Sequence, residues 1–460
     1  MLKESNVDML SGSVFKGLLS MTIPVMIMNV MQNMFNLIDM TVLGKFTNDT
    51  AVGAVGTCGS LITLCTGLLI GVSTGATVII AKSLGRGDEK QTERAVGTSL
   101  MFALISGFAL LIIGICCAQI FLGWINCPQE LMPQAVLYFR IYFLGVPLIL
   151  VYNFCASILR ACGDTKRPMY FLLIGGAVKV ILNYCCITVF NMTVEGAAIS
   201  TIISNAITTA LAFNALMKNT DKLKFNVKSL RIYPSELKEI LFIGVPAGLQ
   251  TALYSLANAL ITTVVNSFGP DATTGISIAN QFDGILYQIS TATAFASMPY
   301  IAQNIGAGNI KRTKKAILSS IFITVIFGAG FGSFSAIYSQ QLSSIMSSTP
   351  AVIEYSCQKM IIVSSTYFIC GINEVMGGTL RGMGKPIIPT ITTLVFLCLI
   401  RFIWVYVIFP LCPTMTFLYL IWPIGWILAI ITQLIAYFPA MSKLQNIQLT
   451  PLKAIYDGVK

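Results

Sequence analysis

The segment IAKSLGRGDEKQTERAV at residues 80–96 recurs as IAQNIGAGNIKRTKKAI at residues 301–317. The two copies are identical at 7 of 17 positions and align at an offset of 221. A second pair has the same offset, because ILRACGDTKRP at 158–168 aligns with TLRGMGKPIIP at 379–389. Several matches in the same order indicate that the chain contains an internal duplication.

The composition identifies the solvent of this chain as a membrane. Of the 460 residues, 55% are hydrophobic and 10% are charged, and the mean hydropathy is +0.80. A soluble protein carries about 25% charged residues, so a water-soluble domain, a disordered chain and a secreted disulfide scaffold are excluded. The sequence has no His, which removes imidazole metal sites and His-activated nucleophiles. We therefore predict a protein that is not an enzyme and has no catalytic residue and no bound metal.

Charge-free runs predict the membrane topology, because a helix needs about 20 apolar residues to cross a bilayer. Six helices in each copy of the repeat return the chain to the same side of the membrane. The fold class predicted is an all-α polytopic membrane protein, with two six-helix lobes related by a pseudo-two-fold axis along the membrane normal. The twelve predicted helices lie near residues 15–43, 52–83, 95–125, 135–162, 169–190, 196–217, 239–266, 272–304, 316–340, 353–381, 389–410 and 415–441.

This topology divides the chain into four parts. We expect an N-terminal lobe at 1–217, a cytoplasmic linker at 218–238, a C-terminal lobe at 239–441 and a cytoplasmic tail at 442–460. Of the 29 Lys and Arg residues, 24 then fall on one side, which the positive-inside rule assigns to the cytoplasm together with both termini. The net charge of +11 is therefore a topology signal, and we expect membrane lipids but no nucleic acid as partners.

Four motifs resemble the multidrug and toxic compound extrusion (MATE) family of cation-coupled antiporters. They are IPVMIMNVMQNMFNLIDMTVLGKF at 23–46, LRACGDTKRP at 159–168, VEGAAISTIIS at 194–204 and IGAGN at 305–309. The resemblance covers nearly the whole chain, in order and in both halves. It implies a secondary active transporter that exports amphiphilic organic compounds such as drugs and dyes by alternating access.

The resemblance also implies the energy source and the setting of this transporter. An inward flow of H⁺ or Na⁺ would drive export, and the choice between the two ions stays open. We expect a monomer without a cofactor in a bacterial plasma membrane, with a small-molecule substrate. An alternative remains, because the same superfamily includes flippases that move lipid-linked cell-wall or polysaccharide precursors.

Ionisable residues inside the predicted spans are candidate functional groups. Each costs about 2.5 to 3.5 kcal/mol on insertion and usually marks a transport pathway or an ion pair. Arg140 lies near the outer end of its span and is expected to reach water. The six residues identified are Asp39, Arg140, Lys179, Asp283, Glu374 and Arg401.

Asp39 matches the acid that the family uses for cation or proton binding in the N-terminal lobe. In the family pattern an Asn and an Asp on the fifth helix and a Thr on the sixth join this acid. The corresponding positions here are Lys179, Asn183 and Thr201. A Lys in this set supplies the positive charge of a bound cation, so the sequence predicts an ion pair between Asp39 and Lys179 and disfavours ordinary Na⁺ binding in this lobe.

Asp283 and Glu374 lie near positions where related proteins carry functional acids in the C-terminal lobe. Carboxylates suit the role because they exchange protons and bind hard cations. For each acid a purely structural role also remains open. Asp283 could pair with Arg401, and Glu374 could lie close to water at the inner end of its helix.

Two further pairs of residues follow the repeat. Lys179 and Arg401 align at an offset of 222 and place one basic residue at mid-membrane in each lobe, which suggests affinity for anionic or zwitterionic cargo. Pro24 and Pro246 align at the same offset in the first helix of each lobe. Proline kinks helices, so both are hinge candidates.

Overall fold

The structure is a computed structural model that describes residues 7–125, 127–218, 223 and 229–457. Every predicted span coincides with a helix or with a run of consecutive helices, which confirms the all-α fold. Within the described residues, nine stretches are long and apolar enough to cross a membrane, or ten if one bent pair counts as a single span. The predicted linker at 218–238 falls largely outside the described residues.

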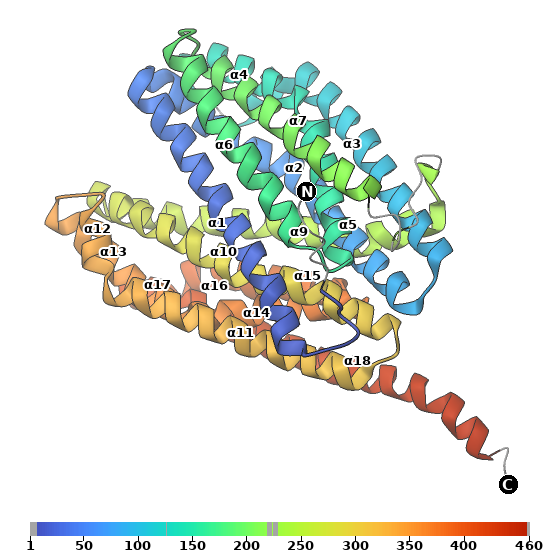
Figure 1. Ribbon diagram of the computed structural model, residues 1–460. Coiled ribbons are helices and arrows are strands. Elements are labelled where there is room, and N and C mark those ends of the chain that lie inside the picture. Colours follow the sequence, from blue (N-terminus) through green and yellow to red (C-terminus); the bar gives the residue numbers. More distant parts are fainter. Residues whose placement is uncertain (1–6, 126, 219–222, 224–228, 458–460) are drawn as a thin grey trace. The chain divides into compact units, whose positions relative to one another are not determined.

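The first half of the chain forms six spans (Figure 1). The fourth span is a pair of helices that meet at Gly145 with a bend of 46°. The helices of this half are α1 (Val14–Phe46), α2 (Asp49–Arg86), α3 (Glu89–Trp124), α4 (Met132–Leu144), α5 (Val146–Ala161), α6 (Lys166–Thr188) and α7 (Val194–Lys218).

The second half repeats this order with more breaks in its last three spans. The helix α18 continues to Asp457, into the segment predicted as a tail. The elements are α9 (Pro234–Asn266), α10 (Pro270–Gly306), α11 (Ile310–Ile337), α12 (Ser339–Ser344), α13 (Pro350–Val363), η2 (Ser364–Thr366), α14 (Tyr367–Gly382), α15 (Ile387–Thr392), η3 (Thr393–Leu399), α16 (Ile400–Ile403), η4 (Trp404–Ile408), η5 (Phe409–Leu411), α17 (Met415–Tyr419) and α18 (Ile421–Asp457).

The repeated turns have the same backbone conformation in both halves. Gly87 and Gly308 occupy equivalent positions of the repeat and have φ of 70° and 71°. Gly163 and Gly384 repeat the pattern with 86° and 77°. These values lie in the left-handed region, which glycine adopts without strain when it ends a helix. The glycines kept by the duplication are therefore those that the turns require.

The residues that follow Gly87 and Gly308 each cap the start of the next helix. Asp88 accepts a hydrogen bond from the backbone N–H of Gln91, and Asn309 accepts one from Arg312. Both are good N-cap residues because a side-chain oxygen satisfies an N–H that has no partner within the helix. One short motif, a glycine followed by Asp or Asn, thus ends one span and begins the next in each half.

The described chain divides into two compact units whose boundaries lie inside helices α1 and α9. One unit consists mainly of Ile27–Gly248, and the other combines Asp8–Met26 with Leu249–Lys460. Met26 aligns with Gly248 at an offset of 222, so the duplication also repeats the boundary. Each half therefore contributes the beginning of its first helix to the unit formed mainly by the other half.

Glycines allow the beginning of α9 to pack closely on α2 within the first unit. A Cβ atom on Gly71 would lie 2.3 Å from Cα of Gly248, and one on Gly75 would lie 2.2 Å from the carbonyl oxygen of Ile240. Gly244 has a similar close contact with the backbone of Val72. Small residues four apart on both helices let membrane helices approach backbone to backbone.

Candidate functional site

Asp39 in α1 faces two residues of α6 in the first unit. Lys179 and Asn183 are four residues apart, so their side chains leave the same face of the helix. Lys179 forms an ion pair with Asp39, and the Asn183 side-chain amide donates a hydrogen bond of 3.0 Å to Oδ1 of the same carboxylate. The side chains of Asp39 and Lys179 are each 16% exposed. The predicted ion pair is therefore present, in a largely buried setting.

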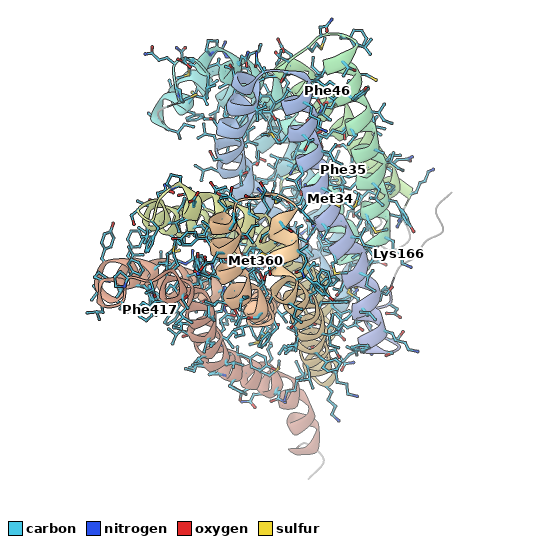
Figure 2. All side chains as sticks on the ribbon, turned by 90° about the vertical axis from the view of Figure 1, so that its left-hand side faces the viewer. Met34, Phe35, Phe46, Lys166, Met360 and Phe417 are labelled. Atoms are coloured by element: carbon cyan, nitrogen blue, oxygen red, sulfur yellow. The ribbon has the colours of Figure 1, made fainter. Side chains whose placement is uncertain are left out.

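A glycine one turn earlier on α6 brings the two helices together. A Cβ on Gly176 would lie 1.9 Å from the ring of Phe35, which occupies this space. Figure 2 shows Phe35 midway along α1, with Phe46 near the end of that helix. Phe35 precedes Asp39 by one turn, so the same contact that seats its ring places the carboxylate beside Lys179.

Thr201 forms no hydrogen bond with this group within the described part of the chain. Its hydroxyl donates a hydrogen bond of 2.8 Å to the carbonyl of Ala197 in its own helix, α7. The structure thus brings together three of the four residues identified in this lobe. Oδ1 of Asn183 is buried and accepts no hydrogen bond within the described part of the chain, so one oxygen remains available beside the neutralised carboxylate.

Asp283 in α10 forms an ion pair with Lys359 of α13, at 2.9 Å. Asn280, one turn earlier on α10, also accepts a hydrogen bond from the Lys359 ammonium group, and Ser364 donates to Asp283 at 3.3 Å. Ser364 belongs to η2, the short 3₁₀ segment that interrupts this span. The Lys359 side chain is 2% exposed and that of Asp283 is 11% exposed.

The alternative in which Asp283 pairs with Arg401 is wrong, because Arg401 has other partners. Its guanidinium donates a hydrogen bond of 2.6 Å to Asn258 and lies 5.4 Å from the ring centre of Tyr254. It also lies 5.2 Å from the ring centre of Trp422, and Lys359 lies 5.3 Å from the same ring. Cations near an aromatic face are stabilised by the ring quadrupole, so the Trp422 indole stabilises both the Lys359 and the Arg401 charge.

The backbone around Arg401 is unusual. Arg401 lies in α16, a four-residue α-helical segment between the π-helical stretches η3 and η4. Such wide turns within a helix are rare and frequently mark functional sites. Arg401 itself is 1% exposed.

Several hydrogen-bond donors in this part of the second unit lack acceptors. The buried atoms without a partner among the described residues include Nη2 of Arg401, Nε1 of Trp404, Nε1 of Trp426 and the hydroxyl of Tyr419. The three aromatic residues belong to one buried cluster with Trp422. Unpaired buried donors are costly, so this interior favours a group that accepts hydrogen bonds.

Glu374 in α14 is half-buried and differs from the other two membrane acids. Within the described part of the chain it forms no ion pair and no hydrogen bond. Arg381 interacts with it electrostatically, and the Arg381 guanidinium donates a hydrogen bond of 2.6 Å to Gln250. The two acids identified in the C-terminal lobe are therefore in different electrostatic situations.

Lys359 is a buried charged residue of this site that sequence reasoning missed. It lies within the predicted span 353–381, directly before the apolar residues Met360, Ile361 and Ile362. A charged residue next to such an apolar run is the sequence signal that could have identified it. Arg140, by contrast, is exposed and donates a hydrogen bond of 3.2 Å to the carbonyl of Ile115. Its access to water stays a prediction.

The two hinge candidates lie inside continuous helices. Pro24 lies within α1 and Pro246 within α9. Each precedes by two positions the place at which its helix passes from one compact unit to the other. Their role as hinges stays a prediction.

Comparison with known proteins adds independent evidence. The family model described as MatE matches residues 24–185 and, a second time, residues 246–407, with both ends at an offset of 222 from the first match. A protein named "Probable multidrug resistance protein YoeA" from Bacillus subtilis is 26% identical over 390 residues, covering 83% of this chain and 84% of that protein. A protein named "FAD transporter" from Shewanella oneidensis is 23% identical over 399 residues, covering 85% of this chain and 87% of that protein.

The fold also matches a solved structure. It is described as the outward-facing conformation of a multidrug resistance MATE family transporter of the MOP superfamily. The TM-score is 0.89 at 20% identity, and the match covers 97% of this chain and 100% of that chain. At this identity the likeness concerns the fold, which it supports over almost the entire length.

Proposed function

The chain belongs to the MatE family, and on that basis we propose that it exports amphiphilic organic compounds in exchange for an inward cation. The relatives named as multidrug resistance proteins support this proposal. The energy comes from the cation gradient, and transport proceeds by alternating access. We place the protein in the bacterial plasma membrane with both termini in the cytoplasm, as the distribution of Lys and Arg favours.

We propose that the coupling ion is a proton and that Glu374 carries it. The observation that supports this assignment is the contrast among the three membrane acids. Asp39 and Asp283 are each paired with a Lys ammonium group, whereas Glu374 has no ion-pair or hydrogen-bond partner among the described residues. An ammonium group in the same site repels Na⁺, and a hard cation prefers several oxygen ligands.

Glu374 has the chemistry that proton exchange requires. A carboxylate inside a membrane is costly while charged, and protonation removes that cost. Uptake and release of one proton therefore change the preferred environment of α14. The helix positions nearest to Glu374 on its C-terminal side include Gly377 and Gly378, which offer no side-chain oxygen for a metal cation.

The cargo is expected to carry a group that accepts hydrogen bonds in addition to its apolar part. The unpartnered donors around Arg401 support this expectation. A zwitterionic or anionic amphiphile satisfies them, whereas a purely cationic dye does not. Both kinds of compound therefore belong in a transport assay.

A cell assay tests the proposal with a matched pair of variants. A host that lacks its own exporters expresses the wild type, Glu374→Gln or Glu354→Gln, and the accumulation of a zwitterionic fluorescent dye is measured. Glu354 is exposed at the start of α13, so its variant controls for loss of a carboxylate elsewhere. We expect low accumulation with the wild type and Glu354→Gln and high accumulation with Glu374→Gln. Equal export by all three proteins would contradict the role of Glu374.

A further inference from the structure

A basic pocket lies beside the first turns of α11, within the second unit and away from the membrane acids. Its volume is about 560 Å³. The N-terminal segment before and at the start of α1 forms one wall, and α11 forms the other. The lining includes Gly12, Phe15, Lys311, Lys315, Leu318 and Ser319.

Arg312 holds one wall of this pocket in place through hydrogen bonds. It donates hydrogen bonds to the carbonyl oxygens of Met9 at 2.9 Å and Gly12 at 2.8 Å, to that of Ser11, and to the Tyr300 hydroxyl at 2.7 Å. The N-terminal segment is thus held against α11 by the side chain of Arg312. Because these bonds use the N–H groups of the guanidinium, we assign Arg312 a role in positioning the N-terminal segment and not in binding a ligand.

Two Lys side chains on the same helix do not hold the N-terminal segment in this way. Lys311 and Lys315 are exposed, and neither forms an ion pair within the described part of the chain. They are four residues apart and therefore lie on one face of α11. The acid nearest in sequence to this wall is Asp8, whose carboxylate accepts hydrogen bonds from Leu10 at 2.9 Å and Ser11 at 2.6 Å.

The same face of α11 becomes apolar further along the helix. Leu318 is 70% exposed and Phe322 is 56% exposed. Phe15 of α1 extends this surface, with its ring centre 6.1 Å from that of Phe322. The segment Ile310–Ile337 is long and apolar enough to cross a membrane, so we expect its first turns to lie at the depth of lipid headgroups. Charge followed by exposed hydrocarbon matches the profile of a phospholipid.

We propose that this pocket binds an anionic phospholipid. The headgroup phosphate lies between Lys311 and Lys315, and the acyl chains lie along Leu318, Phe322 and Phe15. A bound lipid of this kind bridges the start of α1 and the start of α11. Basic pockets between membrane helices at the interface are suited to such headgroups.

Lipid binding to the purified full-length protein tests the proposal by native mass spectrometry. Dioleoyl phosphatidylglycerol is titrated against the wild type, Lys315→Gln, the double variant Lys311→Gln/Lys315→Gln, and Lys314→Gln. Lys314 is exposed on the same helix but does not line the pocket, so it controls for surface charge. Each Lys near the surface contributes about 1 kcal/mol, or roughly a fivefold change in affinity. We expect about fivefold weaker binding for Lys315→Gln, about 25-fold for the double variant and no change for Lys314→Gln.

Two further ligands separate a lipid from a simple anion. Dioleoyl phosphatidylcholine has the same acyl chains without net charge, and glycerol 1-phosphate has the charge without acyl chains. We expect both to bind more weakly than phosphatidylglycerol, and we expect Leu318→Gln to weaken only the binding of lipids. Equal loss with Lys314→Gln, equal binding of phosphatidylcholine, or binding of glycerol 1-phosphate as tight as that of the lipid would overturn the proposal.

Discussion

Lys179 acts as an internal counter-ion at the position where the family resemblance implies cation binding. Lys179 lies one turn before Asn183 on α6, and both side chains contact the Asp39 carboxylate. A carboxylate and an ammonium that are both largely withdrawn from water stabilise each other only as a pair. The first unit therefore carries its own positive charge, which explains why we assign coupling to the second unit.

This pairing predicts a double-mutant cycle. We expect Asp39→Asn and Lys179→Met each to lower the unfolding temperature of the purified protein, because each leaves one charge without its partner. The double variant should lose less stability than the two single changes summed, with a coupling of about 0.5 to 3 kcal/mol. Thermal unfolding in detergent measures all four proteins. Strict additivity would show that the two charges do not interact.

Restoring the family pattern predicts a response to Na⁺. The variant Lys179→Asn/Asn183→Asp replaces the ammonium group with an amide and adds a carboxylate beside Asp39. Oxygen ligands then surround the site, which favours a hard cation. We expect NaCl, compared with choline chloride at the same ionic strength, to raise the unfolding temperature of this variant but not of the wild type. An equal Na⁺ response in both proteins would contradict the role assigned to Lys179.

Lys359 presents a sharper case because it is more deeply buried than Lys179. Removing it leaves Asp283 charged and poorly solvated, at a cost of about 3 to 5 kcal/mol. We expect Lys359→Met to unfold at a markedly lower temperature than the wild type, and Lys359→Met/Asp283→Asn to recover part of the loss. Thermal unfolding provides the measurement. A single variant as stable as the wild type would show that Asp283 does not depend on Lys359.

The two Lys–Asp pairs differ in how far sequence can predict them. The pair in the first unit follows from a family resemblance that places Asp39 near α6. The pair in the second unit has no internal template, because Asp283 aligns with Leu61 and Lys359 with Leu137 at an offset of 222. A Lys side chain can reach acids on several neighbouring helices, so its partner depends on packing that the sequence does not show.

Among the helices, the contact between α2 and α9 depends on glycines. A Cβ on Gly75 would collide with the backbone of α9, whereas one on Gly67, on the same helix, would meet nothing within 4 Å. We expect Gly75→Ala to destabilise the protein by about 1 to 3 kcal/mol, as overpacking does. Gly67→Ala should be neutral or slightly stabilising because alanine favours helix. Equal unfolding temperatures for the two variants would contradict this packing.

Helix ends were more predictable than helix interiors. The duplicated turns contain Gly87 and Gly308 in left-handed conformations, and the repeat identified both positions. The π-helical stretches on either side of Arg401 have no comparable signature in the sequence. The division of α1 and α9 between the two units was also not predicted, since it depends on which helix each half contacts.

Over the chain as a whole, the two halves share their turns and helix order but differ in their membrane acids. Both halves keep the turns, the proline in the first helix and a basic residue at the position of Lys179 and Arg401. The membrane acids do not follow the repeat, and only Glu374 has no ion-pair or hydrogen-bond partner among the described residues. We therefore assign proton coupling to one side chain in one unit.

Transport in liposomes distinguishes proton coupling through Glu374 from Na⁺ coupling and from proton coupling through another residue. Purified protein is reconstituted, and uptake of a zwitterionic fluorescent amphiphile is followed under a pH gradient alone or a Na⁺ gradient alone, with Glu374→Gln and Glu354→Gln as matched variants. We predict uptake that a pH gradient drives, that a Na⁺ gradient does not drive, and that only Glu374→Gln abolishes. Uptake driven by Na⁺ alone, or full proton-driven uptake by Glu374→Gln, would contradict this assignment.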